Sequence, residues 1–315
     1  MSPILLAAAC LAGEGDFNGR WNITVTGEPR NRAWWLEVTG AGTPRLAGKF
    51  VGAPGGQLDA IPEIRISREG QLEFVFQRNY RRGPAEGKSP PARGIYRARL
   101  VDSKLHGSFE IEGAPARALQ WIGVRAPALN ETDDGSWRAG APVPLFSGKD
   151  TSGWQSRIPE RPLQWRVRDG LLTNDSGAAD IVSAARFRNF RLRVDYRVGK
   201  GSNSGIGLRG RYEVQIYEDH GKPPSLHGNG ALYSRILPSV NASKPAGEWQ
   251  TFEITLVGRQ VTVVLNGTKI IDRAEIEGLT AMASDPNEDQ PGPIVLQGDH
   301  GPVEFRSIVV TPLGK

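Results

Sequence analysis

The chain has 315 residues, of which 38% are hydrophobic; this is enough for packed cores and excludes a protein embedded mostly in a membrane. Its net charge of +5 is small and dispersed, so the chain lacks the concentrated basic face that nucleic-acid binding needs. The 39 Gly and 23 Pro residues favour many short strands joined by turns.

Residues 1–12 form a short apolar stretch that ends in small residues around Cys10. This stretch resembles the end of a bacterial lipoprotein signal, although no positive charge precedes it and it is shorter than an ordinary signal core. We expect residues 1–15 to be an export leader to the periplasm or cell envelope. A lipid on Cys10 would be the only membrane attachment, and the alternative is a leader without lipid. A single cysteine excludes an internal disulfide and any multi-cysteine metal site.

Residues 16–125 contain short runs in which apolar and polar residues alternate, the period of half-buried strands. A small antiparallel β-barrel is the expected fold, because closure removes exposed sheet edges. The opening Gly19-Arg20-Trp21 resembles the first strand of lipocalin-like barrels. Residues 78–93 form a basic, Pro-rich loop that either overhangs a ligand or is a solvated hairpin tip. The predicted strands are 21–26, 34–39, 46–51, 63–66, 72–77, 94–100, 104–111 and 119–124.

Residues 126–142 are rich in Pro, Gly and acids and lack periodicity, so we interpret them as a linker. A second β-rich module follows at 143–313. Its Asn266-Gly267 pair predicts a tight hairpin, and its half-apolar strands predict two stacked antiparallel sheets. The strands expected here are 164–167, 170–173, 190–198, 205–208, 212–217, 249–257, 260–265, 268–272, 292–297 and 303–311.

The strand at 212–217 (YEVQIY) carries the first candidate site residues. Alternation puts its apolar residues on one face, toward the core, and Glu213 and Gln215 together on the other. Glu218 would join them only if a β-bulge intervened, and the two carboxyls could then act as acid and base at a glycosidic bond. The alternative is that Glu213 and Gln215 are the solvated half of an amphipathic strand.

Two nearby segments add polar candidates. Asn203 lies in a turn, and Arg209 offers a planar set of donors for sugar hydroxyls or for an ion pair with Glu213. His300, in a glycine-rich turn after Gln297, suits proton transfer near neutral pH. His220 and His227 follow the Glu213 strand closely enough to border the same surface.

Metal and nucleophile motifs are absent. No spacing typical of a metal-binding histidine motif occurs, and the sequence requires no cofactor, although acids and histidines could accept a divalent metal. The acidic loop 285–290 lacks the pattern of a calcium loop, so we interpret it as solvated. A serine-nucleophile elbow and a phosphate loop are also missing.

Taken together, several motifs resemble the 3-keto-disaccharide hydrolase family over residues 143–312. They are 145–154 (LFSGKDTSGW), 165–171 (WRVRDGL), 201–215, 230–233 (GALY), 241–250 (NASKPAGEWQ) and 296–308. The resemblance implies an all-β chain whose C-terminal part is a concanavalin A-like jelly-roll sandwich beside the small barrel. One departure is the step after Gln215, where Glu218 takes the place of an Asp.

The resemblance also implies a reaction. A partner 3-dehydrogenase oxidises the sugar at C3, a base removes the acidified C2 proton, the aglycone leaves from C1, and water adds to give a 3-keto sugar. On this interpretation His300 is the base and Glu213 the acid or an alternative base, with Glu218 as a further candidate. The substrate contacts would come from Asn203, Arg209, Gln215, Gln297 and Lys244.

Two other functions stay open at this level. One is a non-catalytic carbohydrate-binding protein on the same fold, since fold does not determine function. The other is a conventional glycosidase that uses Glu213 and Glu218. The N-terminal barrel lies outside the resemblance, and we expect an accessory sugar- or wall-binding module.

Overall fold

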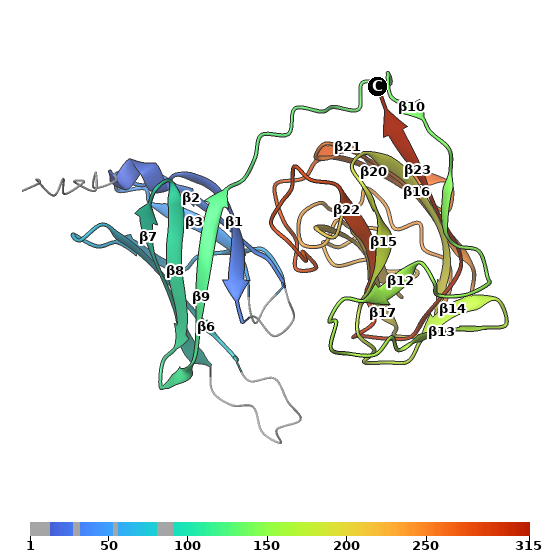
Figure 1. Ribbon diagram of the computed structural model, residues 1–315, viewed down its shortest axis with the longest axis horizontal. Helices are drawn as coiled ribbons and strands as arrows, with labels where there is room; N and C mark the ends of the chain where they lie inside the picture. The colour runs from blue at the N-terminus through green and yellow to red at the C-terminus, as the bar shows by residue number, and fades with distance from the viewer. Residues whose placement is uncertain (1–12, 28–31, 53–55, 81–90) are drawn as a thin grey trace, which may run out of the picture.

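A computed structural model describes residues 13–27, 32–52, 56–80 and 91–315, and Cys10 and most of the basic loop 78–93 lie outside these ranges. The described part of the chain is almost entirely β-structure, arranged as a barrel and a two-layer sandwich side by side (Figure 1). One short 3-10 helix, η1 (Glu14–Phe17), precedes the first strand.

The barrel is a continuous antiparallel sheet in the order β4-β3-β2-β1-β9-β8-β7-β6-β5. Its end strands β4 and β5 follow one another in the chain, and an ion pair between Arg78 and Asp59 joins β6 to β4. Among the described residues no ladder joins β4 to β5, so the expected closure by strand pairing is not formed, and the sheet surrounds one core rich in aromatic side chains. The strands are β1 (Gly19–Thr26), β2 (Trp34–Thr39), β3 (Ala47–Val51), β4 (Asp59–Ala60), β5 (Glu63–Ile66), β6 (Gln71–Arg78), β7 (Ala92–Val101), β8 (Lys104–Ile111) and β9 (Ala114–Arg125).

The outer layer of the sandwich is a sheet in the order β13-β14-β23-β16-β19-β20-β21, with β10 and β11 also paired to β23. Strand β10 falls within the segment expected as a linker. The bounds are β10 (Arg138–Ala139), β11 (Val143–Phe146), β13 (Trp165–Arg168), β14 (Leu171–Asn174), β16 (Phe190–Val198), β19 (Gln250–Val257), β20 (Gln260–Leu265), β21 (Thr268–Glu275) and β23 (Val303–Gly314).

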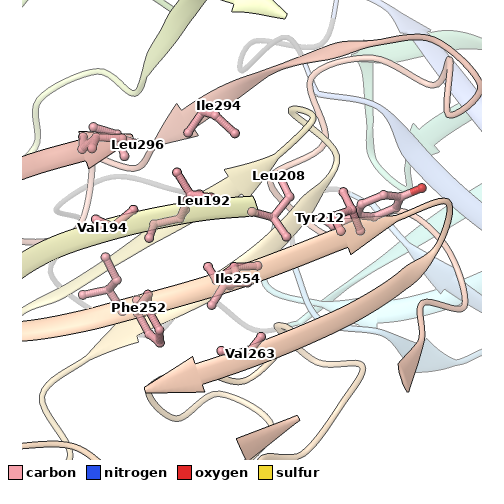
Figure 2. Packing of buried hydrophobic residues seen from close by; sticks show 14 of the residues in the cluster. Leu192, Val194, Leu208, Tyr212, Phe252, Ile254, Val263, Ile294 and Leu296 are labelled. Carbon is pink, nitrogen blue, oxygen red and sulfur yellow. The ribbon is translucent and has the colours of Figure 1, made fainter. Parts of the chain in front are cut away.

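The inner layer is a five-stranded sheet in the order β12-β15-β22-β17-β18. Side chains from both layers interdigitate in one apolar core, as Figure 2 shows for β16, β19 and β22. Two antiparallel sheets stacked in this way form the predicted jelly-roll sandwich. The inner strands are β12 (Trp154–Ser156), β15 (Ile181–Phe187), β17 (Asn203–Leu208), β18 (Tyr212–Tyr217) and β22 (Gly292–Leu296).

Local sequence signals account for much of this arrangement. Asn266 and Gly267 both have positive φ angles, 52° and 83°, and Leu265 pairs with Thr268, so the predicted hairpin is confirmed. Strand β15 is absent from the expected strands. Its register shifts between Val182 and Arg186, which interrupts the alternation that identifies a strand from sequence.

Candidate active site

Strand β18 places Glu213 and Gln215 on the face of the inner sheet that points away from the sandwich core. Their neighbours Tyr212, Val214 and Ile216 are in the core, so the predicted division of faces is confirmed. The polar pair is not solvated, however: Glu213 is 2% exposed and Gln215 is 3% exposed. The alternative interpretation, a solvated strand face, is wrong because another segment covers it.

The cover is residues 276–288, here called the roof segment. Thr280 Oγ1 accepts a hydrogen bond from Glu213 N at 3.0 Å. Met282 packs over β17, where Gly205 and Gly207 lie opposite Gln215 and Glu213 in the ladder. The two glycines leave the room that Met282 and the Glu213 carboxyl occupy.

Gly205→Ala should therefore disturb the site without unfolding the sheet. An added Cβ would lie 2.6 Å from Glu213 Oε1 and 3.0 Å from Met282 Cε, both at the ends of flexible side chains. We expect kcat to fall about 10²-fold, since a displacement of about 1 Å has such an effect, with a native-like thermal melt. Gly140→Ala is the control, because its nearest heavy atom is 3.4 Å away. Wild-type kcat in Gly205→Ala would show that the position of the Glu213 carboxyl is unimportant.

Burial gives Glu213 unusual acid–base behaviour. Desolvation is the main cause that raises its pKa to about 8, and the negative charges of Asp180 and Asp299 act in the same direction. The positive charges of His300 and Arg157 act against them. Glu213 therefore carries a proton at neutral pH and can donate it.

Arg157 and Asp180 form a second part of the cluster. Arg157 Nη1 lies 3.1 Å from Asp180 Oδ2, and Asp180 Oδ1 accepts a hydrogen bond from Gly298 N at 3.0 Å. Burial raises the pKa of Asp180, against the pull of the Arg157 charge. Sequence reasoning missed both residues, since each is a lone charge in a loop without a motif.

The third part is the His300–Asp299 pair in the connection from β22 to β23. His300 Nδ1 contacts Asp299 Oδ1, and the imidazole is 45% exposed. A carboxylate that accepts a hydrogen bond from Nδ1 selects the tautomer in which Nε2 accepts a proton. The structure thus brings the predicted His300 into the electrostatic range of the predicted Glu213.

Polar side chains border this cluster. Gln215 Nε2 donates to Asn203 Oδ1 at 3.1 Å, and in the other amide orientation the Gln215 nitrogen is 3.3 Å from Glu213 Oε1. Gln297 bonds through its backbone N to Gly205 O, and its buried Oε1 has no hydrogen-bond partner among the described residues. Asn203, Gln215 and Gln297 therefore lie together, next to Glu213.

Tyr233 also belongs to this border, although sequence reasoning did not identify it. Its backbone N donates to Glu213 O at 2.9 Å. Burial, and then the charge of Glu213, raises the pKa of its hydroxyl. His227 packs against the Tyr233 ring with centroids 4.8 Å apart, whereas His220 Nδ1 contacts Ser243 O at 2.7 Å.

Two predicted contacts lie elsewhere. Arg209 is fully buried at the turn between β17 and β18, where it contacts Gly258 O and Tyr212 Oη and not Glu213. Burial lowers the pKa of its guanidinium. Lys244 is exposed, and its Nζ donates to Trp249 O, immediately before β19 of the outer sheet. Neither residue supports the predicted role in substrate binding.

The predicted partnership of Glu213 with Glu218 also fails. The β17–β18 ladder runs from Asn203↔Tyr217 to Leu208↔Tyr212 without a register shift, so the required bulge is absent from it. Five residues of regular strand put Glu218 on the opposite face from Glu213. Its carboxylate accepts a hydrogen bond from Gly201 N at 3.1 Å.

The acidic loop 285–290 was expected to be solvated, and the structure shows the contrary for Glu288. This residue is 0% exposed and accepts hydrogen bonds from Tyr212, Arg259 and Asn22.

Among the described residues, no group of three or more His, Cys, Asp or Glu side chains is arranged to hold a metal ion. The same residues include no helix long and apolar enough to cross a membrane.

Fold and site together define a jelly-roll sandwich with a buried acid–base centre on its inner sheet. The family profile of the 3-keto-alpha-glucoside-1,2-lyase-like domain matches residues 141–311, and the chain belongs to this family. The family resemblance seen in the sequence motifs is thereby confirmed.

Individual relatives are more distant. A 3-keto-disaccharide hydrolase of Bacteroides thetaiotaomicron is 24% identical over 166 residues, a match that covers 41% of this chain and 57% of that protein. The chain thus spans less than two thirds of this relative. A Parabacteroides distasonis protein provisionally classed as a glycosyl hydrolase is 27% identical, with a TM-score of 0.48 over 59% of this chain and 91% of the other. A non-specific endo-beta-1,3(4)-glucanase is 13% identical, with a TM-score of 0.36 over 60% of this chain and 100% of the other.

Proposed function

We propose that this protein cleaves glycosides whose sugar carries a ketone at C3. One observation carries the proposal: in a chain of this family, a buried and protonated Glu213 lies within electrostatic range of the His300–Asp299 pair. Family membership and the name of the Bacteroides relative support glycoside cleavage, and the keto-sugar route is our inference.

The proposed first step is proton abstraction. A ketone at C3 acidifies the C2 proton, and His300 Nε2 accepts it while Asp299 holds Nδ1. The C2–H electrons form a C2–C3 double bond, and negative charge collects on the C3 oxygen. Amide donors from Asn203, Gln215 and Gln297 would stabilise this oxyanion.

The proposed second step is elimination. The enolate electrons return to form a C1–C2 double bond, and the bond between C1 and the aglycone oxygen breaks. Glu213 gives its proton to the departing oxygen, which its raised pKa makes feasible at neutral pH. Water then adds across C1 and C2 to give the free 3-keto sugar.

The route needs an oxidised substrate, so we propose that a sugar 3-dehydrogenase acts before this protein. A regular glycosidase would instead need a second carboxyl beside Glu213. Glu218 lies on the other strand face and is not that partner. The two carboxylates that do act on Glu213 electrostatically, Asp180 and Asp299, are paired with Arg157 and His300.

A matched pair of substrates tests the proposal. We expect the protein to release p-nitrophenol from p-nitrophenyl 3-keto-glucoside and not from the parent p-nitrophenyl glucoside. When the reaction runs in D₂O, the 3-keto sugar product should carry one solvent deuterium at C2. The deuterium follows from loss of the C2 proton and later re-protonation. Release from the parent glucoside would favour a conventional glycosidase, and binding of the keto sugar without release would favour a lectin-like function.

A further inference from the structure

The barrel interior is occupied by its own aromatic side chains. Phe74 and Tyr96 stack with ring centroids 4.6 Å apart, and Tyr96 contacts Phe109 at 4.5 Å. Trp34 packs against Phe50 at 5.7 Å, and all five rings are at most 3% exposed. A small barrel filled in this way is a packed core and not a ligand cup. Any influence of the barrel on the site must therefore come from its outer surface.

That outer surface contacts the roof segment, residues 276–288, which lies between barrel and sandwich (Figure 1). Lys49 Nζ donates to Glu277 Oε1 at 2.7 Å, and Ala33 N donates to Ala283 O at 2.9 Å. Trp35 lies against Gly278 so closely that a Cβ there would be 2.1 Å from Trp35 Nε1. The barrel thus holds the roof segment at several points along its length.

Asn22 of β1, which is fully buried, makes two further contacts with this segment. Its Nδ2 donates to Pro286 O at 2.9 Å and to Glu288 Oε2 at 2.7 Å. Burial favours the neutral acid, but hydrogen bonds and charge from Arg259 keep the pKa of Glu288 below its usual value. Arg259 also donates to Pro127 O, in the connection between barrel and sandwich. A buried charge with this many partners fixes geometry, since loss of one partner is costly.

The opposite side of the same segment reaches the acid–base cluster. Thr280 bonds to Glu213 N, and Met282 covers the glycines of β17. The Ala283 carbonyl accepts from Ala33 N on the barrel side and from Arg157 Nη2, at 3.1 Å, on the site side. One peptide group therefore connects the barrel to the guanidinium that faces Asp180.

We propose that the barrel is a positioning module for the Glu213 centre: it holds residues 276–288 closed over Glu213 and orients Arg157 through the Ala283 carbonyl. Asn22 and Trp35 are the main positioning residues. The expected effect on kcat rests on the proposed function. The expected effect on the position of residues 276–288, and on the titration of Glu213, does not. It is an alternative to the expected role of the barrel as a sugar- or wall-binding accessory.

The consequence can be measured at Glu213 itself. The charged and titratable groups that face it are Asp180, Asp299, His300, Arg157 and Tyr233, and the proposed variants change none of them. Because burial is the largest cause of the raised pKa, water admitted by a loosened roof should lower that pKa toward the ordinary value.

The test uses the full-length protein with ¹³C-labelled Glu carboxyls, and Glu213→Gln identifies the Glu213 signal. Gly278→Ala places a methyl group between the roof segment and Trp35, and Asn22→Ala removes the donor to Glu288. We expect the Glu213 titration to move down by about one pH unit or more in each variant. Gly140→Ala and the exposed Thr24→Ala, on the same strand face as Asn22, should leave it unchanged.

Kinetics give a second readout. Whether Glu213 acts as acid or base, the limb of the kcat–pH profile that depends on it should shift downward by the same amount. If Gly278→Ala does not fold, Asn22→Ala decides the question alone. An unshifted Glu213 titration in the folded variants, or a lower kcat with an unchanged pH profile, would overturn the proposal. Failure to turn over keto sugars would refute the proposed function but would leave the titration result valid.

Discussion

Glu213→Gln is expected to lower kcat for a 3-keto-glucoside by about 10²–10⁴-fold, the usual contribution of a general acid or base. The amide retains the shape of the side chain but cannot transfer a proton to the leaving group. Glu253→Gln, an exposed ion-paired position on β19, is the matched control and should keep wild-type activity. The measurement is steady-state release of aglycone between pH 5 and pH 9.

The same substitution should stabilise the fold in alkaline solution. Glu213 has a folded-state pKa of about 8 against an ordinary value of 4.5, so the unfolded chain ionises this group first. Between these two pH values the unfolded state holds fewer protons than the native state, and the free energy of unfolding falls as pH rises. At about 1.36 kcal/mol per pKa unit, the loss is on the order of 5 kcal/mol above pH 8.

Thermal melts of both proteins across this pH range check the sign. Glu213→Gln should melt at a higher temperature than wild type at pH 9, and the difference should shrink as pH falls toward 4.5. A variant that gains stability while it loses activity is the pattern expected for a strained catalytic group. Equal melting temperatures at pH 9 would mean that Glu213 is already ionised and hydrated in the folded protein.

His300→Ala is expected to abolish measurable turnover, a loss of about 10²–10⁴-fold, with folding intact. The imidazole is 45% exposed, so its removal leaves no buried cavity. The C2 exchange of a 3-keto sugar in D₂O should stop together with aglycone release, since both begin with proton abstraction. His106→Ala, at an exposed position of β8, is the control.

Two further results bear on the role of His300. Added imidazole should restore part of the exchange in His300→Ala, and Asp299→Asn should lower the rate less than His300→Ala does, because Asp299 orients the ring and does not itself receive the proton. Wild-type turnover by His300→Ala would remove this histidine from the mechanism. If His300→Ala still exchanges the C2 proton but releases no aglycone, His300 would act in the elimination step instead.

Much of the fold was predictable because strand signals are local. Alternation of period two identified strands such as β2, β8, β16, β18 and β20 with their observed bounds. Strand β15 was missed because its register shift breaks the alternation, and β4, β10 and β12 because two or three residues carry no period. Strand β11 was also missed, and its register shifts between Pro144 and Phe146.

The candidate site was predictable only in part. Glu213, His300, Asn203, Gln215 and Gln297 could be found from strand parity and family motifs, and the structure places them together. Arg157, Asp180 and Tyr233 were missed because they are single residues brought in from three separate connections. Arg209 was assigned wrongly, since sequence shows a cation near Glu213 but not the direction in which a turn residue with φ of 52° points.

The sequence by itself determined which residues share a strand face: Glu213 with Gln215, opposite Tyr212, Val214 and Ile216. Backbone geometry dictates that alternation whatever packs on it. Only the tertiary structure decided that the polar face is buried, because residues 276–288, more than sixty positions along the chain, fold across it. The barrel contacts the other side of these residues. Desolvation depends on this distant packing, and desolvation is what turns an ordinary glutamate into an acid that keeps its proton at neutral pH.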